Sequence, residues 1–140
     1  MIERANLVVA TALGSGLGAI ARWLIAIIIA DNAAGAFPWA TLVANGAGSF
    51  IIGVAAALAT TEGHVMATPA VRQFVMVGVC GGLTTFSVFS LEALSFIQSE
   101  AFGLATAYVI GSLCIWLCAV WCGFALARRL VSRKEHLTPG

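Results

Sequence analysis

The third long apolar segment of this chain contains, at its centre, the sequence Cys80-Gly81-Gly82-Leu83-Thr84-Thr85-Phe86-Ser87-Val88-Phe89-Ser90. Two glycines followed closely by two β-branched threonines make a poor helix. Inside hydrocarbon every backbone N–H and C=O needs a partner, so an interruption survives only where protein buries it or where it lines an ion or water site. The stretch therefore predicts a functional break that frees carbonyl oxygens around Gly81 and Thr84, which are suited to a hard cation. The alternative is a simple helix kink.

Aromatic residues follow the expected break. Phe86 and Phe89 are three residues apart and share one helical face. The edge of a phenyl ring carries a positive partial charge, so an edge-on ring can weakly solvate a small anion. Conduction needs binding that is adequate but not strong. The alternative for such a pair is a place in the core or against lipid.

Polar and charged side chains interrupt the other apolar segments. Asn45 lies in the second segment, and its amide provides two N–H donors. Tyr108 and Ser112 lie four residues apart in the fourth, with two hydroxyls on one face. These groups serve either to join helices or to donate to a passing anion. Arg22 and Glu92 are the deepest charges, and such residues are functional candidates. Arg22 is either an interfacial anchor or a vestibule cation that concentrates anions, and the role of Glu92 is open.

The composition places the chain in a membrane. Of its 140 residues, 61% are hydrophobic and 9% are charged, against about 25% charged residues in an ordinary soluble domain. There are too few charges to cover a water-facing globule, so the apolar surface must face lipid. The net charge of +1 provides no field for nucleic acid. His64 and His136 both lie in polar segments, and no nucleophile–base pair is visible, so we expect no enzymatic activity.

The sequence predicts one all-α transmembrane domain over residues 1–140. A spanning helix needs roughly 20 predominantly apolar residues, and four segments qualify. Their expected ranges are about 6–30, 39–59, 72–97 and 103–127. Because the connections are short, sequential helices should be antiparallel neighbours, with both termini on one side of the membrane.

The charges predict which side that is. Six basic residues lie on the side of the termini: Arg4, Arg72, Arg128, Arg129, Arg133 and Lys134. The opposite loops carry no Lys or Arg. Cytoplasmic loops carry the excess of Lys and Arg in membrane proteins, so both termini should be cytoplasmic. We expect a multi-pass protein of the cell inner membrane.

Small residues recur at four-residue spacing in the apolar segments, in the pairs Gly14/Gly18, Ser49/Gly53 and Gly78/Gly82. Such pairs let helix backbones approach closely where lipid gives no hydrophobic drive to associate. Together they predict tightly packed helices.

Over nearly its whole length the chain resembles the CrcB/Fluc fluoride channels. The matching motifs are Gly18-Ala19-Ile20-Ala21-Arg22-Trp23, the segment from Phe37-Pro38-Trp39 through Asn45 to Gly48-Ser49-Phe50, and Gly81 to Ser90 in the third apolar segment. The resemblance implies passive export of fluoride, which protects the cytoplasm from its toxicity. It also implies an antiparallel (dual-topology) dimer of four-helix subunits with two narrow pores.

The resemblance further implies roles for particular residues. Its pore-lining positions fall on Asn45, Thr85, Phe86, Phe89, Tyr108 and Ser112. Arg22 matches the first-helix arginine, at the vestibule. A central, non-transported Na⁺ would be held by the backbone carbonyls of Gly81 and Thr84, together with the same pair from the partner.

Several alternatives stay open. The charge bias of six basic residues against none is unexpected for a homodimer inserted both ways round, so the partner is either a second copy or an oppositely oriented homologue. A small proton-coupled multidrug exporter would need a mid-membrane carboxylate, which the first helix lacks. A non-conducting scaffold protein would explain the glycines but not the clustered Gly-Gly, Thr-Thr and Phe pair.

Overall fold

The computed structural model describes residues 2–29, 37–61 and 64–137, and every regular element in these ranges is helical. Three long helices are α1 (Ile2–Ile29), α2 (Trp39–Ala59) and α6 (Phe102–Leu137). Between α2 and α6 the chain forms a series of shorter pieces: η1 (Val65–Ala67), α3 (Pro69–Arg72), η2 (Gln73–Val79), α4 (Cys80–Leu83) and α5 (Phe86–Gln98).

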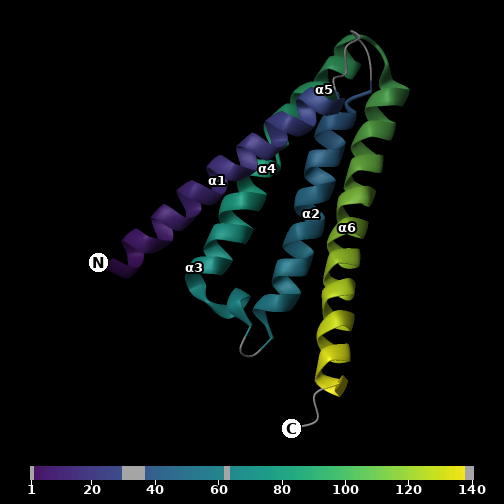
Figure 1. The fold of residues 1–140 in the computed structure, drawn as a ribbon. Helices are drawn as coiled ribbons and strands as arrows, with labels where there is room; N and C mark the ends of the chain where they lie inside the picture. Colours follow the sequence, from purple (N-terminus) through teal and green to yellow (C-terminus); the bar gives the residue numbers. More distant parts are fainter. Residues whose placement is uncertain (1, 30–36, 62–63, 138–140) are drawn as a thin grey trace.

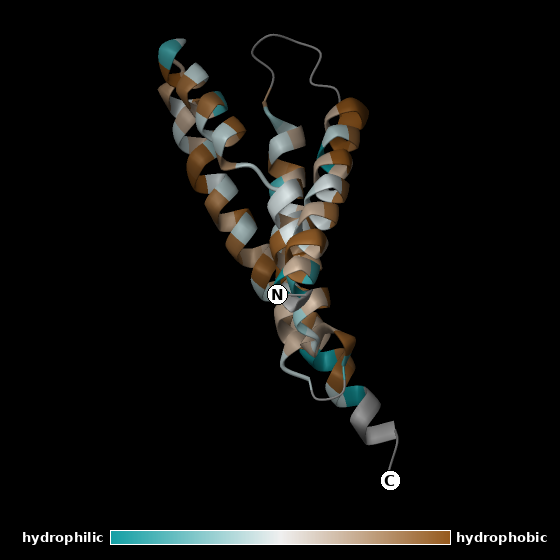
Figure 2. Ribbon diagram, turned by 90° about the vertical axis from the view of Figure 1, so that its left-hand side faces the viewer, coloured by the Kyte–Doolittle hydropathy of each residue, from teal (hydrophilic) through white to brown (hydrophobic). Residues whose placement is uncertain are grey.

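Four helical segments are long and apolar enough to cross a membrane: Arg4–Ile29, Trp39–Ala59, Pro69–Gln98 and Phe102–Arg133. Only 11% of the most apolar window is buried in the first and in the fourth segment, so large apolar faces point outward. Brown, hydrophobic positions recur along all of the long helices (Figure 2). The prediction of an all-helical chain with four spans is confirmed, and the protein is a multi-pass membrane protein.

The spans form two pairs. Helix α1 packs against the first half of the third span, while α2 lies along α6 (Figure 1). The start of α1, helix α3 and the end of α6 lie toward the lower end of the molecule in that view. The basic residues of that end, Arg4, Arg72, Arg128, Arg129 and Arg133, are exposed.

Glycine brings α1 into backbone contact with the third span. A Cβ added at Gly18 would collide with the carbonyl oxygen of Val79, and one at Gly82 would collide with that of Ser15. At Gly78 the added atom would lie 2.8 Å from the Cα of Gly14. The close approach predicted from the spaced small residues is confirmed here, because any side chain would push the two helices apart.

A second glycine crossing joins α2 to α6. Side chains at Gly53 and Gly123 would strike the carbonyl oxygens of Val120 and Phe50, respectively. A Cβ at Gly48, also on α2, would collide with the Thr84 side chain. The contacts at Gly53, Gly123 and Gly48 therefore fix α2 between α6 and the centre of the third span.

The third span departs from regular helix before its centre. Gln73–Val79 is a π-helix, and the N–H of Cys80 bonds to the carbonyl of Val75. Such wide turns are rare and are frequently found at functional sites. The fourth span also differs from its expected range, since α6 continues as helix through the basic segment to Leu137.

We predict that Gly18→Ala lowers the stability of the folded protein by about 1–3 kcal/mol, the usual cost of overpacking. The matched control is Gly16→Ala, because a Cβ there meets nothing within 4 Å. Thermal melts in detergent, followed by size-exclusion chromatography, should show a lower melting temperature for Gly18→Ala alone. Equal melting temperatures for both variants would contradict the close contact.

Candidate functional site

The centre of the third span is extended for two residues. Helix α4 ends at Leu83 and α5 begins at Phe86, with Thr84 at φ −82°, ψ 156° and Thr85 at φ −147°, ψ 125° between them. Gly81 and Gly82, by contrast, remain inside α4. β-branched side chains favour extended backbone, which explains why the threonines rather than the glycines leave the helix.

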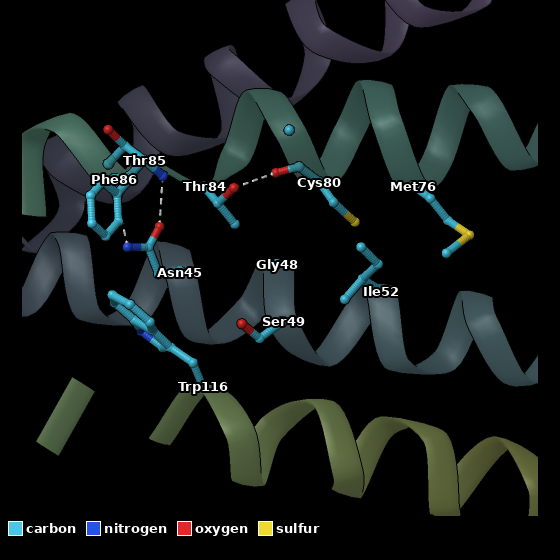
Figure 3. A pocket seen from close by; sticks show the side chains of 11 residues that line it. Asn45, Gly48, Ser49, Ile52, Met76, Cys80, Thr84, Thr85, Phe86 and Trp116 are labelled. Atoms are coloured by element: carbon cyan, nitrogen blue, oxygen red, sulfur yellow. Dashed lines mark hydrogen bonds between the residues drawn. The ribbon is translucent and has the colours of Figure 1, made fainter. Parts of the chain in front are cut away.

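The Asn45 side chain forms hydrogen bonds with the backbone of Thr85, where the helix is interrupted. The N–H of Thr85 donates to Asn45 Oδ1 at 2.7 Å, and Asn45 Nδ2 donates to the carbonyl of Thr85 at 2.9 Å (Figure 3). In a continuous helix that N–H would bond to the carbonyl of Gly81, four residues earlier. The buried Asn45 amide thus pairs with the extended backbone as a neighbouring strand would, and one of its N–H donors remains.

The flanking helix ends are closed by threonine hydroxyls. Thr84 Oγ1 and the Thr84 N–H both donate to the carbonyl of Cys80, at 2.9 and 3.0 Å. Thr85 Oγ1 accepts the N–H of Val88 at 3.3 Å and caps α5. Because the Thr85 and Val88 amides are engaged in this way, the carbonyls of Gly81 and Thr84 lack the donors that a continuous helix would supply.

A cavity of about 370 Å³ opens beside the extended residues, between α2, the third span and α6. Its polar lining comes from Asn45, Ser49, Thr84 and Thr85, and its aromatic lining from Phe86 and Trp116 (Figure 3). No charged side chain is among the described residues that line it. Phe86 is 73% exposed, so this side of the site faces out of the subunit.

A second cavity, of about 310 Å³, lies between α1, α2 and α5. Arg22, Trp23, Thr41 and Thr85 contribute to its lining. Thr85 therefore borders both cavities, whereas Phe86 lines only the first and the half-buried Arg22 only the second.

Two hydroxyls converge on a carboxylate inside the bundle. Thr41 Oγ1 donates to Glu92 Oε1 at 2.7 Å, and the Tyr108 hydroxyl donates to Glu92 Oε2 at 2.6 Å. Thr41 and Tyr108 are 6% and 0% exposed, respectively. Sequence reasoning missed Thr41 and left Glu92 unassigned. A usable signal existed, since Thr41 lies four residues before Asn45 and shares its helical face.

The remaining predicted pore-lining residues are buried and do not line the first cavity. Phe89 is buried, with its ring centroid 5.1 Å from that of Tyr108 and 5.7 Å from that of Phe86. Ser112 is 1% exposed. The structure thus places Asn45, Thr85 and Phe86 on the first cavity, Arg22 on the second, and Phe89, Tyr108 and Ser112 in the neighbouring interior.

Comparison with known proteins gives consistent matches over most of the chain. Residues 9–124 match the family described as CrcB-like protein, Camphor Resistance (CrcB). A protein of Paramagnetospirillum magneticum named fluoride-specific ion channel FluC is 47% identical over 83% of this chain and 91% of its own length. A protein of the same name from Opitutus terrae is 45% identical over 88% and 93%. The FluC 1 protein of Rhodopseudomonas palustris is 44% identical over 91% of each chain.

With a family match that covers most of the chain, and relatives this similar over nearly their full lengths, this chain belongs to the CrcB family.

Proposed function

We propose that this protein is a fluoride-selective channel, through which fluoride leaves the cytoplasm passively. The observation that carries the proposal is the pairing of Asn45 with the extended backbone at Thr85, beside a cavity lined by neutral donors and a phenyl ring. The relatives' printed name, fluoride-specific ion channel, supports the same function. We assign a functional role to the interruption at Thr84 and Thr85, rather than that of a simple kink.

The chemistry of the first cavity suits a small, strongly hydrated anion. The remaining N–H of Asn45 and the threonine and serine hydroxyls can replace part of the hydration shell. The positive edge of the Phe86 ring adds weak attraction. Because these donors are neutral, they hold an anion weakly enough to release it, as conduction requires. Arg22, at the second cavity, raises the local anion concentration as a vestibule cation.

The outer face of the site requires a protein neighbour. Gly81, Phe86, Ser87 and Ser90 are all exposed at the middle of the third span, where hydrocarbon is a poor solvent for hydroxyls and free carbonyls. We propose that a second, oppositely oriented subunit covers this face. This second subunit is either another copy of the chain or a homologue that inserts into the membrane in the opposite orientation. Exposed arginines at one end support insertion in the inner membrane with that end in the cytoplasm.

A structural Na⁺ fits the oxygens left by the extended segment. The carbonyls of Gly81 and Thr84 lack their helical donors, and carbonyl oxygens are hard ligands. We propose that these two oxygens and the same pair from the partner hold one Na⁺, which joins the subunits and is not transported.

Fluoride efflux from liposomes that contain the purified protein tests the function directly. An ion-selective electrode should record fluoride efflux far faster than chloride efflux, and collapse of a proton gradient should not change it. Glu92 is the only carboxylate within the described spans, so a proton-coupled exporter would depend on it and on the gradient. Equal chloride efflux, or strict dependence on a proton gradient, would contradict the channel.

Substitution of Asn45 or Phe86 should reduce fluoride flux while the dimer still assembles. Asn45→Asp replaces an N–H donor by a carboxylate that repels both fluoride and the Thr85 carbonyl, so we expect flux to fall by about tenfold or more. Phe86→Ile removes the polar ring edge and should reduce flux by about fivefold. The matched control is Phe102→Ile, because Phe102 is 60% exposed and lines neither cavity. Wild-type flux in both site variants would remove these residues from the pathway.

The Na⁺ proposal predicts that Na⁺ stabilises the dimer by mass action. Purified protein should melt at a higher temperature in sodium chloride than in N-methylglucamine chloride of equal ionic strength. The fraction of dimer after cross-linking should fall in parallel when Na⁺ is removed. Identical melting curves and identical cross-linking in the two salts would exclude a structural Na⁺.

A further inference from the structure

Helix α6 is longer than the apolar part of a bilayer is thick. It has 36 residues and lies at the edge of the molecule, beside α2 (Figure 1). At about 1.5 Å per residue it extends over about 54 Å, whereas the hydrocarbon measures about 30 Å. No charged residue occurs from Phe102 to Ala127, and Arg128 and Arg129 follow directly. A helix that enters the hydrocarbon at Phe102 leaves it after about 20 residues, close to Trp121, so these arginines lie at the membrane surface.

The inward face of α6 is already filled by α2. A Cβ at Gly123 would collide with the carbonyl oxygen of Phe50 on α2. Ala127, one turn later, is buried as well. Because residues four apart share a helical face, this face is packed down to the level of Arg128. A ligand of the arginines therefore approaches from the outer face of α6, which faces lipid.

The outer face of α6 carries an ordered series of side chains: apolar, then aromatic, then basic. Leu117 and Trp121, four residues apart, are 72% and 70% exposed. Arg128 and Arg129 follow Trp121 by seven and eight residues, share its face and are exposed. Helical side chains lean toward the N-terminus of the helix, so both arginine side chains lean back toward the membrane. The series matches a section through one leaflet, from acyl chains through the interface, where Trp is enriched, to the phosphates.

We propose that this outer face of α6 binds an anionic phospholipid. The guanidinium groups of Arg128 and Arg129 hold its phosphate, for which the planar arginine fork is well shaped. Trp121 lies against the glycerol region and Leu117 against an acyl chain. The occupant is a lipid rather than a soluble anion, because a free phosphate would leave the apolar and aromatic part of the series unused. This surface is separate from the proposed fluoride path and does not depend on it.

Native mass spectrometry tests the lipid preference. Purified protein is equilibrated in micelles that contain equal amounts of phosphatidylglycerol and phosphatidylcholine with identical acyl chains. The wild type should retain mainly phosphatidylglycerol. The double variant Arg128→Gln/Arg129→Gln should lose about fivefold in this preference for each arginine removed. The variant Arg128→Lys/Arg129→Lys keeps both charges and should keep most of the preference.

The matched control is Arg4→Gln/Arg72→Gln. It removes the same charge from exposed arginines at the same end of the molecule, but from α1 and α3. This variant should retain phosphatidylglycerol nearly as the wild type does. Equal loss in both glutamine pairs would show attraction spread over the whole basic end and would overturn a site on α6. Undiminished retention in Arg128→Gln/Arg129→Gln would overturn it as well.

Thermal melts separate a lipid from a soluble anion as the ligand. In phosphatidylcholine nanodiscs, addition of phosphatidylglycerol should raise the melting temperature of the wild type by about 3 °C or more. Inorganic phosphate added to the same nanodiscs should not change it. The same rise with phosphate alone would replace the lipid by a soluble ligand and contradict the proposal. Neither measurement involves fluoride flux, so a negative result leaves the proposed channel function intact.

Discussion

The structure depends on one constraint: two extended residues at the middle of a membrane span must find hydrogen bonds without water. At Thr85 the Asn45 side chain supplies both a donor and an acceptor, at 2.9 and 2.7 Å. This pairing holds only if α2 stays at a fixed distance from the third span. The glycine contacts of α2 with α6, and of Gly48 with Thr84, set that distance. The packing of the helices and the geometry of the candidate site therefore depend on each other.

Charged and neutral groups line different cavities beside the extended segment. Arg22 borders one cavity, and neutral donors line the other, while Thr85 borders both. The Glu92 carboxylate is engaged by Thr41 and Tyr108 within the bundle. A strong positive charge in the first cavity would hold an anion too tightly, and an unengaged carboxylate there would repel it. The arrangement suits an anion that must enter, lose water and leave.

Much of this was predictable from the sequence, and the failures have physical causes. Apolar segments of about 20 residues predicted the four spans, and small residues at four-residue spacing predicted the close helix contacts. The Gly-Gly pair was expected to weaken the helix, yet both glycines lie in α4 and the threonines are extended. Gly82 is small because Ser15 of α1 lies against it, a contact that no local propensity reveals. Similarly, only the folded bundle brings Thr41 and Tyr108 to Glu92 and leaves Trp116 Nε1 without a partner among the described residues.

Asn45 pairs with the extended backbone at Thr85, and we propose that Thr84 and Thr85 remain extended in the membrane and lie beside the ion path. Solid-state NMR of the labelled protein in bilayers tests it most directly, because Cα and Cβ chemical shifts distinguish extended from helical residues. We expect extended shifts at Thr84 and Thr85, and a change at the Asn45 side-chain amide when fluoride is added. Helical shifts at both threonines, with an Asn45 amide that does not respond to fluoride, would contradict it.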